Sequence, residues 1–317
     1  MTKPRRHIAG QVALLTRRCS ERRYFLRPDD YLGKVLPYEI GKAADKYEQH
    51  VYAALAMSNH VHFAIGDTTG DRSDFMRDSM SGIARSRNRD LGRSGHFWES
   101  GSYNDTVLLK REAIERKLLY TWLNPVQAGL VERAEDWPGF MILPKHWGKT
   151  IRIEKPERFY GRESSDVVEF TPQPPPGYED MSLEEVKEHF ERLLEIAEDE
   201  IAAVRREFNE EVRGADNVKE VDPMDSPSTP DPWRGSNPRF ATKDRELMAA
   251  AKAAYRAFVD RYETRRQRWV KGQTRGNKIT FPCGTVQLKR QAPITCEGPP
   301  DDEPGLFTRS GLDTSLP

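Results

Sequence analysis

Apolar and polar positions along residues 1–148 form a pattern of short apolar segments separated by longer segments with helical periodicity. This pattern predicts the order strand, helix, strand, strand, helix, strand, helix, over residues 11–18, 29–50, 51–57, 60–65, 73–89, 102–109 and 111–123. That order fits an α+β fold, a ferredoxin-like split βαβ antiparallel sheet with helices on one face. The remainder of the chain predicts a mainly helical C-terminal extension.

The extension divides by composition into five further segments. Four closely spaced prolines, at positions 172, 174, 175 and 176, favour a linker over 149–180. Residues 181–213 predict an acidic helix that begins at a capping box of Ser182 and Glu185. A Pro/Ser/Asp-rich composition over 214–238 indicates a disordered linker. Residues 239–292 predict a basic helix and a short hairpin at 278–289, and 293–317 a tail.

Composition excludes several classes of protein. The chain has 317 residues, of which 37% are hydrophobic, and no apolar run approaches the roughly 18 residues of a membrane span. Gly10 and Gln11 interrupt the first apolar segment, which is therefore a poor signal peptide. The three cysteines are too widely spaced for a zinc ribbon or a disulfide framework. We expect a cytoplasmic protein.

The formal net charge of zero conceals three blocks of charge. Residues 1–150 hold 24 Lys+Arg and 18 Asp+Glu, a net of +6; residues 177–225 carry 17 acids and 6 bases, and residues 239–290 carry 14 bases and 4 acids. Basic blocks of this kind suit a polyanion such as nucleic acid. Solvated helix faces joined by a disordered acidic linker would give the same pattern.

The segment Ser58–Ile65 carries the first candidate chemistry. Side chains alternate along a strand, so His60 and His62 share one face while Val61, Phe63 and Ile65 occupy the other. Two neighbouring imidazoles are able to hold one metal ion. The alternative is two surface histidines that meet by chance.

A second candidate group lies at the end of the last predicted helix. Tyr120 and Asn124 are four residues apart and share one helix face, and Pro125 ends the helix. A tyrosine and a carboxamide facing a two-histidine metal site suit phosphodiester transfer, in which the phenol attacks phosphorus. A half-buried structural tyrosine is the alternative for Tyr120.

Taken in order, these motifs resemble the REP-associated tyrosine transposases, the single-tyrosine, insertion-sequence-200-like branch of the His-hydrophobic-His nucleases. The resemblance covers about residues 5–140, and it rests on residues 17–25, 57–63, 95–100, 120–131 and 135–138. The family usually has Pro where this chain has Ser58, and Ile where it has Thr121. Neither difference touches a reacting group.

The resemblance implies cleavage of single-stranded DNA near an imperfect hairpin, with Tyr120 joined to the 5′ phosphate. His60 and His62 would hold Mg²⁺ or Mn²⁺, with Asn124 as third ligand. A second 3′-OH would reverse the step and rejoin strands. The predicted partner is thus single-stranded or hairpin DNA, and both a homodimer and a monomer remain open.

Further residues are candidates for DNA contact. Arg17, Arg18, Arg22 and Arg23 are placed to neutralise phosphates, and Tyr24, Phe97 and Trp98 offer aromatic rings on which unpaired bases would stack. Trp98 is equally compatible with a core position. The acidic helix is a candidate for masking this DNA surface.

Two other functions compete with the nickase. One is a non-catalytic hairpin-binding module that descends from a transposase. The other is a hydrolytic metal enzyme, in which Asp67 or Glu99 would join the two histidines as a carboxylate ligand. The intact set His60, His62, Tyr120 and Asn124 favours the nickase.

Overall fold

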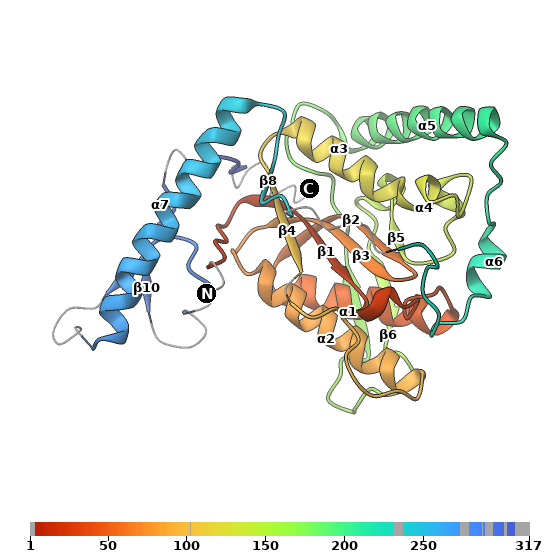
Figure 1. The fold of residues 1–317 in the computed structure, drawn as a ribbon, viewed down its shortest axis with the longest axis horizontal. Helices are drawn as coiled ribbons and strands as arrows, with labels where there is room; N and C mark the ends of the chain where they lie inside the picture. Colours follow the sequence, from red (N-terminus) through yellow and green to blue (C-terminus); the bar gives the residue numbers. More distant parts are fainter. Residues whose placement is uncertain are drawn as a thin grey trace.

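A six-stranded sheet forms the centre of the molecule (Figure 1), and its strands lie in the order β5-β2-β3-β1-β4-β8. The computed structural model describes residues 4–101, 103–230, 237–272, 279–286, 288, 294–300 and 303–307. All neighbouring strands are antiparallel except β4 and β8. The strands are β1 (Gln11–Arg18), β2 (Gln49–Met57), β3 (His60–Asp67), β4 (Asn104–Leu108), β5 (Met141–Ile142) and β8 (Phe240–Ala241).

The first four strands, with α1 (Asp30–Lys46) and α2 (Arg72–Asp90), form the predicted split βαβ unit, and the α+β class is confirmed. Asp29 begins α1 because its carboxylate accepts a hydrogen bond from the backbone N–H of Leu32. Strands β2 and β3 meet at a tight turn at residues 58–59. None of the helices in the described ranges is long and apolar enough to cross a membrane.

Helices cover both faces of the sheet, whereas the sequence led us to expect them on one. Helices α1 and α2 pack on the face that carries Val61, Phe63 and Ile65, and the helices α3 (Arg111–Trp122), α4 (Asn124–Gln127) and α5 (Leu183–Phe208) lie on the other (Figure 1). The reason is that β1 and β2 are apolar on both faces, so each face must be covered.

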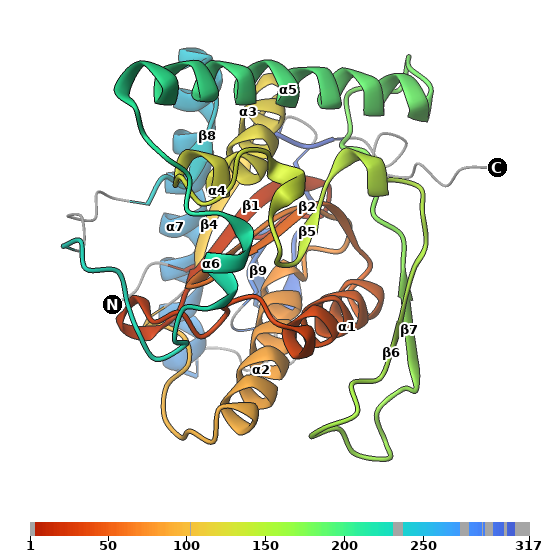
Figure 2. The same ribbon diagram turned by 90° about the vertical axis from the view of Figure 1, so that its right-hand side faces the viewer.

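The acidic helix predicted over 181–213 is α5, and it is docked onto the core. Its Ser182 capping box forms as expected. Phe190 is fully buried, with its ring centroid 5.2 Å from that of Trp147 and 5.8 Å from that of Trp122. Figure 2 shows α5 lying across α3 on the sheet's upper side.

The segment 149–180, expected as a linker, contains a β-hairpin. Strands β6 (Ile151–Glu154) and β7 (Val167–Phe170) pair antiparallel and lie beside α1 (Figure 2). Phe170 packs so closely on Gly41 of α1 that a Cβ added there would come within 2.5 Å of the ring. The hairpin therefore extends the core that α1 forms with the sheet.

The C-terminal region differs from the expected hairpin. The basic helix is present as α7 (Arg245–Val270), but β9 (Thr280–Phe281) pairs in parallel with β10 (Thr295–Cys296), and after the turn at Pro282 the chain bridges to Arg6 at Thr285. The N-terminal segment thus takes the place of the predicted partner strand. The hairpin's predicted ends, Lys278 and Lys289, lie outside the described residues. The remaining short elements are η1 (Ser20–Arg22), η2 (Ala134–Asp136), η3 (Pro144–His146) and α6 (Ala215–Lys219).

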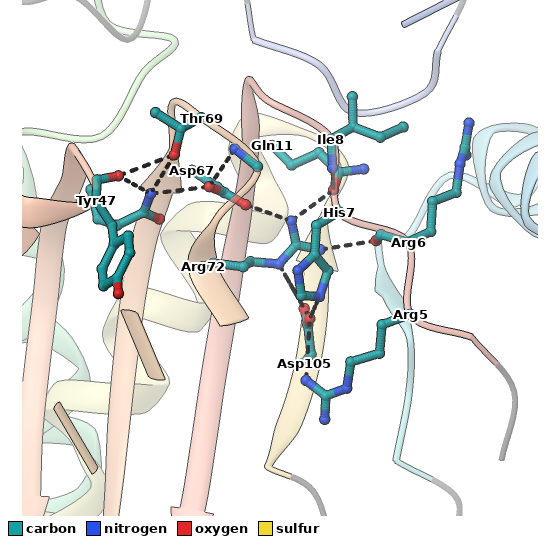
Figure 3. A network of polar contacts seen from close by, with 12 residues as sticks. Arg5, Arg6, His7, Ile8, Gln11, Tyr47, Asp67, Thr69, Arg72 and Asp105 are labelled. Atoms are coloured by element: carbon teal, nitrogen blue, oxygen red, sulfur yellow. Dashed lines mark hydrogen bonds and ion pairs between the residues drawn. The ribbon is translucent and has the colours of Figure 1, made fainter. Parts of the chain in front are cut away.

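A buried polar network joins β1, β3, β4 and α2 (Figure 3). Arg72 is 1% exposed; its guanidinium donates to Asp67 at 2.9 Å and to Asp105 at 3.2 Å. Gln11 accepts a further hydrogen bond from Arg72 at 3.0 Å. The Arg72 charge holds the pKa of Asp105 far below its usual range, although burial acts in the opposite direction as the largest single influence.

We expect Arg72→Met to destabilise the fold by about 3–5 kcal/mol, because it leaves the carboxylate of Asp67 buried without its ion-pair partner and leaves Asp105 with His7 and the more distant Arg5. The free energy of unfolding in urea measures this. Arg152→Met is the matched control: Arg152 pairs with Glu169 on the surface, where an ion pair contributes roughly 0–1 kcal/mol. Equal losses for both variants would contradict the account.

Candidate active site

The two histidines of β3 lie on the sheet face that α3 covers. In the antiparallel register of β1 and β3, His62 is opposite Thr16 and His60 is opposite Arg18. Helix α3 crosses this face and brings Tyr120 toward the strand; Asn124 follows at the start of α4. The predicted cluster of His60, His62, Tyr120 and Asn124 therefore comes together.

The side chains of this cluster are in contact. The ring centroids of His60 and His62 are 4.8 Å apart, and those of His62 and Tyr120 are 5.6 Å apart, with the planes nearly perpendicular in both pairs. Nδ2 of Asn124 lies 3.4 Å from Nε2 of His62. A half-turn of that carboxamide about its Cβ–Cγ bond presents Oδ1 to the same point. Tyr120 is 40% exposed, so part of this residue is accessible to solvent.

Neighbouring side chains fix the orientation of both imidazoles. Nδ1 of His60 donates to Oδ1 of Asn59 at 2.7 Å, since a carboxamide oxygen only accepts, and Nε2 of His60 therefore carries a lone pair. Nδ1 of His62 lies 2.9 Å from the Thr16 hydroxyl, which leaves Nε2 of His62 facing Asn124. Contacts at Nδ1 of this kind are typical of histidines that bind a metal through the other nitrogen.

Burial keeps both imidazoles neutral. Burial, and then the charge of Arg18, lower the pKa of His60 to about 4. Burial, and then His60 and Lys117, hold the pKa of His62 well below its usual value. Neutral imidazole is the form that ligates a metal, so at neutral pH both side chains are in the protonation state that metal binding requires.

The donor set of two imidazoles and one carboxamide fits such an ion. Its ligands are all neutral, so the positive charge of an ion would remain available to a phosphate. Within the described residues, no group of three His, Cys, Asp or Glu side chains is placed to hold a metal. Asp67, one of the two carboxylates that the hydrolytic alternative would use, lies at the far end of β3 from the histidines and pairs with Arg72.

The arginines predicted to contact DNA fall into two groups. Arg18 lies near His60, whereas Arg17 faces the opposite side of β1, with its guanidinium carbon 5.9 Å from the Trp98 ring centroid. Arg22 and Arg23 contact the segment 221–229: Arg22 donates to the carbonyl of Thr229, and Arg23 donates to the carbonyl of Met224. The segment that covers these arginines thus follows α5, whereas we expected the acidic helix itself to do so.

Two of the three aromatic candidates, Phe97 and Trp98, are more buried than a stacking role implies, whereas Tyr24 is half-buried. The backbone N–H of Tyr24 donates to the carbonyl of Asp225 at 2.9 Å. Phe97 is 3% exposed and packs between Phe25 and Trp98 in the core. Trp98 is 8% exposed, and its indole N–H donates to the carbonyl of Met80. Phe97 is therefore a core residue, and Trp98 is largely buried.

Three residues of the site were not anticipated. Thr16 and Asn59 hold the histidines, and Nζ of Lys117 lies 4.8 Å from the centre of the Tyr120 ring. Burial, and then Arg116, lower the pKa of Lys117. The spacing of Lys117 three residues before Tyr120 was the one available signal; the position of Thr16 depends on the strand register.

Comparison with known proteins gives similarity to solved structures only. No model of a protein family matches the chain, and no curated protein does. A structure of a REP-associated tyrosine transposase bound to a REP hairpin is similar at 21% identity, covering 46% of this chain and 85% of that chain, with a TM-score of 0.39. A putative transposase from Deinococcus radiodurans is similar at 18% identity, covering 38% and 95%, with a TM-score of 0.27.

We expect His60 of the metal-free protein to titrate near pH 4. An unfolded imidazole takes up its proton near 6.5, so unfolding binds a proton between these values and acidification from 6.5 to 4 lowers stability. A histidine-detected NMR titration, assigned with His60→Gln, measures the midpoint. The same resonance in urea, returning to about 6.5, is the control; a folded midpoint at 6.5 would contradict the assigned burial.

Proposed function

We propose that this chain is a metal-dependent single-strand DNA endonuclease and strand transferase, of the transposase kind, that acts at hairpin DNA through a 5′-phosphotyrosine intermediate. The observation that carries the proposal is the contact between an exposed tyrosine and a pair of oriented, neutral histidines, with a carboxamide beside them. The hairpin substrate rests on the resemblance of the sequence motifs, and REP hairpin DNA is also the ligand named for the first similar structure.

The cleavage step balances without an added reagent. Oη of Tyr120 attacks the scissile phosphorus, the new O–P bond forms, and the bond from phosphorus to the 3′ oxygen breaks. The phenolic proton is released and the departing 3′ oxygen gains a proton, so a free 3′-OH results. The phosphotyrosine bond conserves the energy of the phosphodiester, and a second 3′-OH reverses the same step to join strands.

This chain's own residues do three things in that step. Lys117 places positive charge beside the Tyr120 ring, where it stabilises charge that develops on the phenol and the phosphate. Thr16 and Asn59 orient the imidazoles. His60, His62 and Asn124 would hold Mg²⁺ or Mn²⁺, which supplies Lewis-acid polarisation of a phosphate oxygen when bound.

The cluster is complete within one chain. His60, His62, Tyr120 and Asn124 all belong to the same copy and are already in contact. This arrangement supports our proposal that a monomer cuts DNA without a second copy. A dimer would be needed only for exchange between two DNA ends.

The direct test incubates the full chain with a labelled hairpin oligonucleotide that has a single-stranded tail, in Mn²⁺ or Mg²⁺. We expect a covalent protein–DNA band on a denaturing gel, because the DNA becomes attached to Tyr120. The band should be absent in Tyr120→Phe and in the presence of EDTA. Tyr31→Phe, a tyrosine on α1 outside the cluster, is the matched control and should keep the band.

The outcomes separate the competing functions. Cleavage that persists in Tyr120→Phe would show that another group is the nucleophile. Tight, salt-sensitive binding with no band in any condition would indicate the hairpin-binding module in place of the nickase.

Thr16→Val should slow adduct formation roughly 10–100-fold at limiting metal, because His62 loses the hydroxyl that orients it. Excess metal should restore part of the rate, which a purely structural defect would not allow. Thr106→Val on the neighbouring strand β4 is the matched control. A Thr16→Val rate that equals that of the control at every metal concentration would rule out this positioning role.

A further inference from the structure

A cavity of about 640 Å³ lies at the β4 side of the sheet, away from the tyrosine–histidine cluster. Arg17 lines it, and Arg17 is adjacent in β1 to Thr16, which contacts His62; neighbouring residues of a strand point to opposite faces. Its walls come from the N-terminal segment, α2, β4 and the C-terminal residues 237, 239, 240, 255 and 286. Volumes of about 300–1,000 Å³ are typical of sites for small molecules.

The cavity wall is strongly basic. Six arginines and one carboxylate, that of Asp105, line it; the arginines are Arg5, Arg6, Arg17, Arg72, Arg77 and Arg239. Some of this charge is neutralised elsewhere, since Arg6 pairs with Glu303 and Arg77 with Asp74. Figure 3 shows how Arg72 and Arg5 share the single carboxylate of Asp105, which lies 3.9 Å from Arg5.

Arg17 and Arg239 supply charge that the described residues do not balance. Within the described ranges, neither guanidinium has a carboxylate at ion-pair distance. Nε of Arg17 is a buried donor with no hydrogen-bond partner there, and the hydroxyl of Tyr103 is in the same state. Buried polar atoms are almost always paired, so these two groups facing one cavity indicate a polar occupant.

Aromatic rings line the same cavity beside the arginines. Trp98, Tyr103 and Tyr255 each have a guanidinium near the ring: that of Arg17 at 5.9 Å, of Arg5 at 3.7 Å and of Arg239 at 3.9 Å from the respective ring centroid. Nucleobases stack on the planes of arginine guanidinium groups as well as on aromatic rings, so the guanidinium planes beside these rings suit a base. The arginines also provide forked donors for phosphate.

We propose that this cavity binds one nucleotide unit, with its phosphate at Arg17 and Arg239 and its base among the aromatic rings. An unpaired nucleotide of the DNA substrate and a free nucleoside monophosphate share this chemistry, and the experiment distinguishes them. The DNA source rests on the proposed function, in which single-stranded DNA reaches this protein. The cavity then binds the DNA strand on the face of β1 opposite to the candidate active site.

The test uses the full chain carrying Arg17→Gln together with Arg239→Gln, and Arg152→Gln as the matched control on the surface of β6. The probes are a labelled hairpin oligonucleotide with an unpaired tail, the same hairpin without the tail, and a mixture of the four deoxynucleoside monophosphates. Binding is measured by fluorescence anisotropy across salt concentrations and by calorimetry. Tyr120→Phe serves as the background, so that no cleavage occurs during binding.

We expect the double variant to bind the tailed hairpin roughly 10-fold or more weakly, with a shallower salt dependence, while the blunt hairpin is affected less. If monophosphates also bind the wild type, and the variant loses that binding, the occupant is a free nucleotide. Affinities of the variant equal to those of Arg152→Gln for every probe would overturn the proposal.

Failure of this proposal is distinct from failure of the proposed function. Unchanged affinities together with a Tyr120 adduct would contradict nucleotide binding in the cavity and support the nickase. Weakened binding by the double variant, with no adduct in the protein that retains Tyr120, would support nucleotide binding in the cavity and contradict the nickase.

Discussion

The alternation of side chains along β3 is the constraint on which the rest of the structure depends. Val61, Phe63 and Ile65 enter the core beneath α1 and α2, and this burial forces the residues between them onto the opposite face. His60 and His62 are thereby held side by side at one end of the strand. A shift of register by one residue would bury the imidazoles under α1 and α2 and separate them from Tyr120 and Asn124. The register that packs the core therefore also places the candidate catalytic residues.

Sequence patterns were sufficient for the seven elements predicted over residues 11–123, because each one has a strong local signal. Strand β1 coincides with its predicted bounds, and Asp29 and Ser182 begin the helices that they were expected to begin. The second helical layer was missed because β2 is apolar at nearly every position, a pattern that does not show how many layers cover it. The β6–β7 hairpin was missed because its short strands stand among loop-forming residues.

The residues of the candidate site also divide into those that the sequence identified and those that it did not. Residues with a characteristic local spacing, His60 with His62 and Tyr120 with Asn124, were identified and come together. Thr16 and Asn59 contribute only through the register and the turn, which spacing does not reveal. The basic cavity depends on residues 17, 103 and 239, far apart in the sequence, so only the tertiary structure brings its charges together. The acidic region is part of the fold, since α5 covers α3 and the segment after it contacts Arg22 and Arg23.

Mapping the attachment site tests the central claim most directly. The protein is allowed to react with hairpin DNA, digested with nuclease and trypsin, and its peptides are sequenced by mass spectrometry. The peptide covering residues 118–133 contains Tyr120 as its one tyrosine. The account predicts a nucleotide 5′ phosphate on that residue, dependent on added metal. A nucleotide on any other residue, or DNA that is cut while this peptide stays unmodified, would contradict it.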